Sequence, residues 1–123
     1  MKYSLLIKTL CICYFTCFGS FTAIAQSEYP TKPVKIIVPF PPGGTTDLMA
    51  RISAEQLTKI LKQAFVIENI AGGGGVIGAE RAAGAQADGY TLVMTGVGQN
   101  AVAHGLDPNL KYDSIKDFAH ISL

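Results

Sequence analysis

The chain has 123 residues, 49% of them hydrophobic, and this is enough to form one modest core. Its ten basic and nine acidic side chains nearly balance to a formal net charge of +1, and none of them gather into a basic tract. Composition therefore gives no indication of a protein that binds nucleic acid or an anionic membrane surface.

The first 25 residues have the order of a secretory signal peptide. Lys2 and Lys8 give a positive start, and an uncharged apolar run then ends in Ala-Ile-Ala at Ala25. A retained membrane anchor would need about 20 apolar residues, and this run is shorter. A lipid anchor is disfavoured by the residues around Cys13 and Cys17. We therefore expect export, with cleavage after Ala25.

Cleavage at that point changes the composition of the mature chain. The three cysteines all lie in the removed segment, so the mature 98 residues have no thiol, no disulfide and no cysteine ligand for a metal. Two of the ten basic residues are removed as well, which leaves eight basic against nine acidic residues. Residues 26–33 form a leader segment, and 26–32 are expected to be flexible.

The mature part predicts an α/β fold. Short apolar runs at 34–40, 65–68 and 90–94 predict strands, and they alternate with helical patterns at 45–62 and 76–84. This order implies a parallel sheet with right-handed crossover connections. Residues 118–123 have the pattern of a further strand that is only beginning. We therefore expect residues 34–123 to be the first part of a larger folding unit.

The first predicted helix begins at Thr45 or Thr46. Threonine is a competent N-cap, and Asp47 in the first turn suits the positive end of the helix dipole. Four apolar residues recur at spacings of four, three and four, as on one packed face of a helix: Ala50, Ala54, Leu57 and Leu61.

Ligands of open α/β sheets bind at the carboxyl ends of the strands, where the segments 40–47, 69–78 and 95–101 fall. In the first, two prolines stiffen the chain, and Gly43 and Gly44 allow close approach of a ligand to the backbone. The helix that follows offers N–H groups to a carboxylate or phosphate. Taken alone, the segment fits an ordinary strand-to-helix turn better.

The other two segments are less specific. The glycines of residues 73–78 match a dinucleotide-binding fingerprint as a string, but three residues separate them from the strand. The acidic residue expected about 20 positions later is also missing. We therefore interpret these glycines as positions of tight packing. The hydroxyl and amide groups of residues 95–100 fit either a polar ligand or a turn.

The sequence offers no catalytic constellation. It has no Gly-x-Ser-x-Gly motif and no pair of histidines at metal-binding spacing. His104 and His120 are isolated and are interpreted as surface or loop residues. Asp113 and Asp117 are interpreted as turn and helix-start residues. We expect no catalytic residue, no metal and no cofactor.

Several short motifs follow one another in a fixed order behind the signal sequence. They are Tyr29-Pro30-x-Lys32-Pro33, Val38-Pro39-Phe40-Pro41-Pro42-Gly43-Gly44-x-x-Asp47, Glu68-Asn69, Gly78-Ala79-Glu80, Asp88-Gly89-Tyr90-Thr91-Leu92, Tyr112-Asp113 and Lys116-Asp117-Phe118. In this order they resemble the Bug-type receptors, the solute-binding subunits of tripartite tricarboxylate transporters. The resemblance runs from about Tyr29 to the end of the chain.

The resemblance implies a two-lobed periplasmic binding protein of the type II, or flytrap, class. This sequence would supply only the first part of lobe 1, and the rest of lobe 1 and all of lobe 2 would be absent. Such receptors bind small carboxylates and pass them to the membrane subunits of the transporter. Two loops of the first lobe hold the ligand. Carried over, their residues are Phe40, Pro42, Gly43, Gly44, Thr45, Asp47, Thr95, Gly96 and Gln99.

The resemblance also implies a role for each part of these loops. Phe40 would close over the apolar part of the ligand, and the backbone of residues 42–45 would receive a carboxylate. Asp47 would hold the loop or bond a ligand amine. Thr95, Gly96 and Gln99 would donate from the opposite side.

Two other functions stay open. The chain could begin a secreted α/β enzyme whose catalytic residues lie beyond Leu123, or it could be a truncated remnant without function. Neither predicted ligand loop contains a nucleophile next to a base, which favours the receptor.

Overall fold

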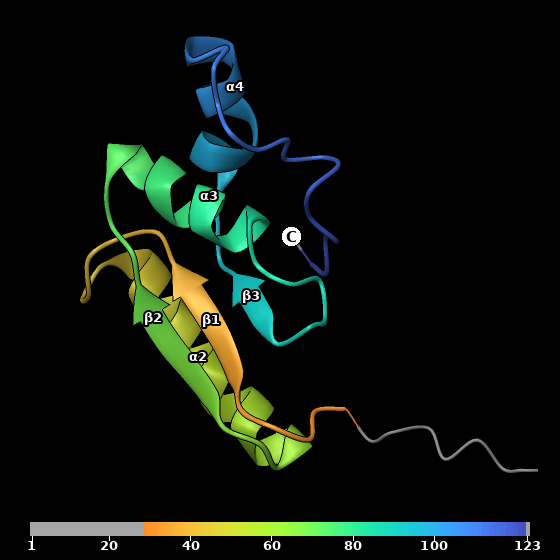
Figure 1. Ribbon diagram of the computed structural model, residues 1–123. Helices are drawn as coiled ribbons and strands as arrows, with labels where there is room; N and C mark the ends of the chain where they lie inside the picture. The colour runs from red at the N-terminus through yellow and green to blue at the C-terminus, as the bar shows by residue number, and fades with distance from the viewer. Residues whose placement is uncertain (1–28, 123) are drawn as a thin grey trace, which may run out of the picture.

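A computed structural model describes residues 29–122, so the expected signal peptide and its cleavage site lie outside the described residues. Three strands form one parallel sheet (Figure 1): β1 (Val34–Val38), β2 (Phe65–Asn69) and β3 (Thr91–Val93). The strand order is β2-β1-β3, which places β1 in the centre. The predicted α/β fold with a parallel sheet is confirmed.

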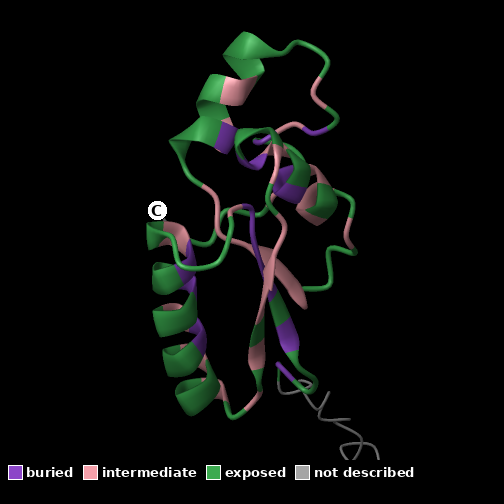
Figure 2. Cartoon of the chain, turned by 90° about the vertical axis from the view of Figure 1, so that its left-hand side faces the viewer, coloured by how far each residue is buried: buried purple, intermediate pink, exposed green. Residues whose placement is uncertain are grey.

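Two helices connect the strands and lie on opposite faces of the sheet (Figure 2). Helix α2 (Thr45–Leu61) packs against β1 and β2, and helix α3 (Val76–Ala83) packs against β1 and β3. The chain crosses the sheet in one direction to β2 and in the other to β3. Two right-handed connections in opposite directions put their helices on opposite faces.

The core lies between β1 and α2. Ile36 and Val38 of the central strand pack there against Ala50 and Ala54 of the helix. These small helical residues allow α2 to approach the sheet closely. Leu57 and Leu61 are half-buried on the same side, so the predicted apolar face of the helix is confirmed.

Several details differ from the sequence predictions. Strand β1 ends at Val38, because Pro39 has no N–H group to continue the ladder. Helix α2 has Gly44 as its N-cap and no side-chain cap, so the expected threonine cap is wrong: Thr45 already lies inside the helix.

The end of the chain also differs. Residues 98–106 form two short helical segments, η2 (Gly98–Val102) and α4 (Ala103–Leu106), where the sequence predicted only a loop up to residue 101. Residues 118–122 form no strand. Instead His120 folds back so that its Nε2 lies 2.8 Å from the Ser114 carbonyl oxygen. The segment therefore pairs with its own turn and not with the sheet.

The part of the leader that the structure describes is anchored, although a flexible segment was expected. The Tyr29 hydroxyl donates to the carbonyl of Gly89 over 2.6 Å, and the Thr31 N–H donates to the Tyr90 hydroxyl over 3.0 Å. Lys32 lies 3.5 Å from the carboxylate of Asp88. These contacts hold the start of β1 to the turn before β3.

Between residues 29 and 122, no helix has the length and apolar character that crossing a membrane requires.

Gly78 provides a test of the packing between α3 and the sheet. A Cβ atom at this buried position would lie 2.7 Å from the Ile70 carbonyl oxygen and 2.8 Å from the Pro39 Cα, so backbone blocks it on two sides. We expect Gly78→Ala to lower the free energy of unfolding by about 1–3 kcal/mol in chemical denaturation. Gly84→Ala is the matched control, since its nearest contact would be at 3.6 Å. Equal stability of the two variants would contradict this packing.

Candidate functional site

The strand order reverses between the neighbouring strands β1 and β3, and this reversal marks one point at the edge of the sheet. The chain leaves β1 towards one side and later returns to form β3 on the other side, so the loops after these two strands diverge. The Met94 N–H donates to the Ile37 carbonyl over 2.9 Å and holds the two strand ends together. Ligands of open α/β sheets bind at such a switch point. The two predicted ligand loops, 40–47 and 95–100, both begin there.

The start of α2 is open to solvent. Residues 41–45 are exposed, and no side chain caps the helix at Gly44. The first intrahelical bond runs from the Leu48 N–H to the Gly44 carbonyl, over 2.9 Å. The N–H groups of residues 45–47 come before this bond, so the helix itself gives them no acceptor. They form a site of partial positive charge.

Asp47 is buried just behind this helix end. Its Oδ2 accepts hydrogen bonds from the Gly43 N–H and from Arg51 Nε, each over 2.9 Å. Its Oδ1 accepts from Asn69 Nδ2 over 2.9 Å, and the side chain is 4% exposed. Of the two roles implied for Asp47, this geometry supports the holding of the loop.

Asn69 extends this network to the loop before the helix. Its Nδ2 also donates to the Phe40 carbonyl over 3.1 Å, and its Oδ1 lies 3.4 Å from Arg51. The hydrogen bond from Arg51, followed by those from Gly43 and Asn69, holds the pKa of the Asp47 carboxyl well below its usual value. Asp47 therefore remains an anion at neutral pH.

Sequence reasoning missed Arg51 and Asn69 as members of the site. A signal for Arg51 was present, because Asp47 and Arg51 have the spacing that brings side chains together on a helix. Asn69 lies in the candidate segment 69–78 and in the Glu68-Asn69 motif, but no role was predicted for it, although it ends β2 at the same edge of the sheet as the two loops.

The loop after β3 is held by its own side chains. Thr95 Oγ1 donates to Asn100 Oδ1 over 3.1 Å. Gln99 is 3% exposed, and its Oε1 accepts from the Gly96 N–H over 3.1 Å. Its Nε2 donates to the Gly74 carbonyl over 2.5 Å. Both ends of the Gln99 amide thus have partners within the protein.

The remaining predicted residues lie at the same edge. Phe40 is half-buried and packs against the core cluster, so the fold already covers part of its side chain. Pro42 is exposed next to Gly43, whose φ of +88° favours glycine. The structure thus brings all nine predicted residues to the carboxyl edge of the sheet.

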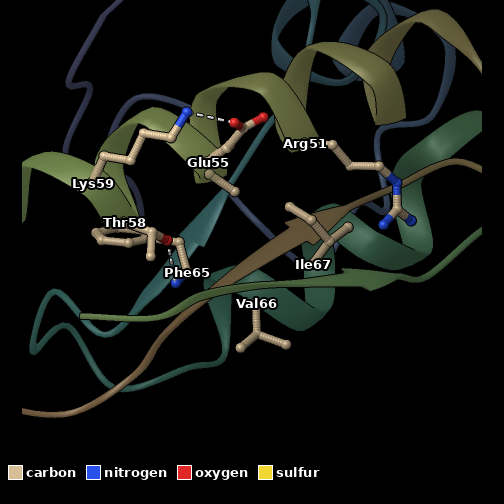
Figure 3. Close-up of a pocket in the computed structure, with 8 residues that line it drawn as sticks. Arg51, Glu55, Thr58, Lys59, Phe65, Val66 and Ile67 are labelled. Atoms are coloured by element: carbon tan, nitrogen blue, oxygen red, sulfur yellow. Dashed lines mark hydrogen bonds and ion pairs between the residues drawn. The ribbon is translucent and has the colours of Figure 1, made fainter. Parts of the chain in front are cut away.

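An open depression of about 590 Å³ lies elsewhere, between α2 and the edge strand β2 (Figure 3). Lys59 at its rim is paired with Glu55 over 2.5 Å, and Arg51 is paired with Asp47. Its other lining residues are mainly apolar, among them Phe65 and Ile67. It lies away from the loops that follow β1 and β3, and its cations are already paired. The loop edge is therefore the better candidate site.

The histidines do not form a metal centre. Among residues 29–122, no group of three His, Cys, Asp or Glu side chains is placed to bind a metal ion. Both histidines are exposed and contact one backbone residue: the Ser114 N–H donates to His104 Nε2 over 3.2 Å, and His120 contacts the Ser114 carbonyl.

Comparison with known proteins relates the chain to transport receptors. The profile described as "Tripartite tricarboxylate transporter family receptor" matches residues 49–123. The protein BugT of Bordetella pertussis is 42% identical over 106 residues, which are 85% of this chain and 32% of BugT. The chain therefore spans about a third of the length of this relative.

The chain is also similar to several solved structures. MatC from Rhodopseudomonas palustris with bound malate is similar with a TM-score of 0.70 and 41% identity, over 73% of this chain and 31% of MatC. Another R. palustris protein, with adipate, has a TM-score of 0.56 and 44% identity over 57% of this chain and 23% of its own. The periplasmic binding protein BugD is also similar, with a TM-score of 0.51 and 46% identity over 53% of this chain and 22% of its own. The predicted fold class is thereby confirmed.

Asp47→Asn tests the buried network. The folded-state pKa of Asp47 is lowered, so the carboxylate stabilises the protein above its unfolded pKa of about 4 and this stabilisation is lost as pH falls through the folded-state pKa. We expect the variant to unfold at a lower urea concentration at pH 7. The difference from wild type should shrink below about pH 4.

Glu55→Gln is the matched control, since it removes a carboxylate from an exposed pair with Lys59 on the same helix. Its urea midpoint should change little. An Asp47→Asn variant as stable as Glu55→Gln at pH 7 would contradict the holding role of Asp47.

Proposed function

The chain belongs to the tripartite tricarboxylate transporter receptor family, and from this we propose that it is part of a periplasmic receptor that binds a small carboxylate. The observation that carries the proposal is the uncapped start of α2. Its first N–H groups face solvent at the switch point of the sheet, and helix N-termini of this kind bind carboxylates.

The charges around this helix end support recognition by dipoles. No lysine or arginine occurs between Phe40 and Ala50. The first cation of the helix, Arg51, is bonded to Asp47. A ligand carboxylate would therefore be bound by the N–H groups of Gly44 and the first turn of α2, because Pro42 has no N–H and the Gly43 N–H is bonded to Asp47. Because Asp47 faces Gly43 and not the helix end, its negative charge would not occupy that position.

The second loop would complete the same face of the site. Gly96 is exposed and Thr95 is half-buried, so both would contribute contact surface to the ligand, while the Gly96 N–H and the Thr95 hydroxyl donate within the loop, to Gln99 and Asn100. Gln99 lies directly behind them. The malate and adipate of the two related structures are dicarboxylates, and we propose this class for the present protein.

The proposal extends to partners and location. As in its family, the receptor would pass its ligand to the membrane subunits of a tripartite transporter. The structural neighbour BugD is a periplasmic binding protein, and neither loop contains a nucleophile paired with a base, so we propose binding without catalysis.

Binding is tested with malate and adipate by titration calorimetry on the protein expressed from its complete gene. We expect wild type to bind at least one of them and Gly44→Val to bind it about tenfold more weakly, a loss of about 1.4 kcal/mol. Valine tolerates the φ of −80° and ψ of 171° at this position, but its side chain would block approach to the N–H groups.

Lys59→Ala is the control for this experiment, because Lys59 lines the depression beside β2 and lies away from the loops. It should bind as wild type does. If Lys59→Ala weakened binding and Gly44→Val did not, the depression would replace the loop edge as the site.

Export makes a separate prediction. The protein recovered from the periplasm should begin at Gln26, as N-terminal sequencing would establish. Recovery in the membrane fraction with Met1 retained would contradict it.

A further inference from the structure

We propose that Gln99 is a positioning residue, which fixes the loop after β3 to the glycine-rich segment 72–75 before any ligand binds. The proposal rests on the proposed function, because it concerns the geometry of the same two loops. It assigns to Gln99 a different task from the direct donation to the ligand that the family resemblance implies.

The hydrogen bonds of Gln99 support this task. Its Oε1 accepts from the Gly96 N–H, so it closes the loop locally, and its Nε2 donates to the Gly74 carbonyl, 25 residues away. With 3% exposure, the side chain has little access to a ligand. To donate to a ligand, Nε2 would have to turn away from the Gly74 carbonyl and lose that hydrogen bond.

The surroundings of Gln99 are shaped to hold it. A Cβ atom on Gly75 would overlap with the Gln99 amide, and Gly75 has a φ of +98°. From another side, the Tyr112 hydroxyl donates to the Gln99 carbonyl over 2.6 Å, and Tyr112 is itself buried. Side chain and backbone of Gln99 are therefore both fixed.

The glycine-rich segment is fixed at its other end to the first ligand loop. Asn69 precedes it and binds both Asp47 and the Phe40 carbonyl. The Ile70 N–H then donates to the Val38 carbonyl over 2.8 Å. The segment 69–75 thus connects the two ligand loops. Asn69 at its start is bonded to the first loop, and the Gly74 carbonyl near its end accepts from Gln99 of the second loop. Gln99 controls the spacing between the loops through this connection.

Two substitutions at Gln99 separate its hydrogen bonds from its size. Gln99→Met keeps a similar length but removes both bonds, and we expect about tenfold weaker binding of malate and adipate, in line with the loss of one or two buried hydrogen bonds. Gln99→Glu keeps the acceptor for Gly96 but places a carboxylate against the Gly74 carbonyl. It should also bind more weakly near pH 7.

The glutamate variant gives a readout that simple destabilisation would not produce. When protonated, its carboxyl again has one donor and one acceptor. Burial raises the pKa of such a group, so the ratio of wild-type to Gln99→Glu affinity should approach one as pH falls from about 7 to about 5. Taking the ratio removes the titration of the ligand. Gln99→Met should show no such recovery.

A glycine pair provides a second comparison. Gly75→Ala would displace the Gln99 amide, whereas a Cβ on Gly74 meets nothing within 4 Å although its φ is also positive, at +63°. We expect Gly75→Ala to weaken binding severalfold more than Gly74→Ala. Equal effects of the two substitutions would overturn the proposal.

Hydrogen exchange tests the positioning without any ligand. In wild type the Gly96 N–H should be protected by Gln99, and Gln99→Met should speed its exchange while the amides of β1 stay protected. If wild type bound no dicarboxylate, the proposed function would fail, but this exchange would still test the loop geometry. Unchanged Gly96 exchange, or unchanged affinity of Gln99→Met in a protein that binds, would overturn the positioning role alone.

Discussion

The candidate site depends on where one buried carboxylate points. Asp47 occupies the third helical position of α2, from which an acidic side chain commonly reaches back to the N-cap N–H. Here it reaches one residue further, to Gly43, and takes two more hydrogen bonds from Arg51 and Asn69. The carboxylate thus stabilises the loop and leaves the first N–H groups of the helix for another anion.

Arg51 has a part in the same arrangement. An unpaired arginine one turn into the helix would attract any anion to its own side chain. Paired with Asp47 at 2.9 Å, it contributes a charge that is already neutralised. The proposed recognition at the helix start would then rest on backbone dipoles, whose directions are set by the fold and not by a mobile side chain.

Sequence periodicity predicted the parts of this structure that depend on burial. The strands and both crossover helices follow from apolar runs and spacings, and Ala50 and Ala54 were correctly assigned to the packed face. The predicted ligand loops lie together at one edge of the sheet, because parallel strands end together. Local chemistry was less informative at the helix start, where a glycine and not a threonine is the N-cap.

The parts that sequence did not predict depend on contacts between distant residues. Gln99 meets Gly74 only because α3 brings the two segments together, and no local pattern reveals an acceptor 25 positions away. The helical turns after Gly98 were missed for a related reason, since Tyr112 and Ser114 bond to their carbonyls from further along the chain. The strand expected at 118–123 has no partner strand among the described residues.

Recognition by dipoles makes exact loop geometry important. One N–H group contributes a modest free energy, and several must point at the same oxygen atoms to hold a ligand. A loop that had to order itself on binding would lose part of that gain as conformational entropy. Asp47 and Gln99 both remove this cost, because each fixes one loop through hydrogen bonds that exist without a ligand. Two polar side chains that never touch the ligand would then set how tightly the backbone binds it.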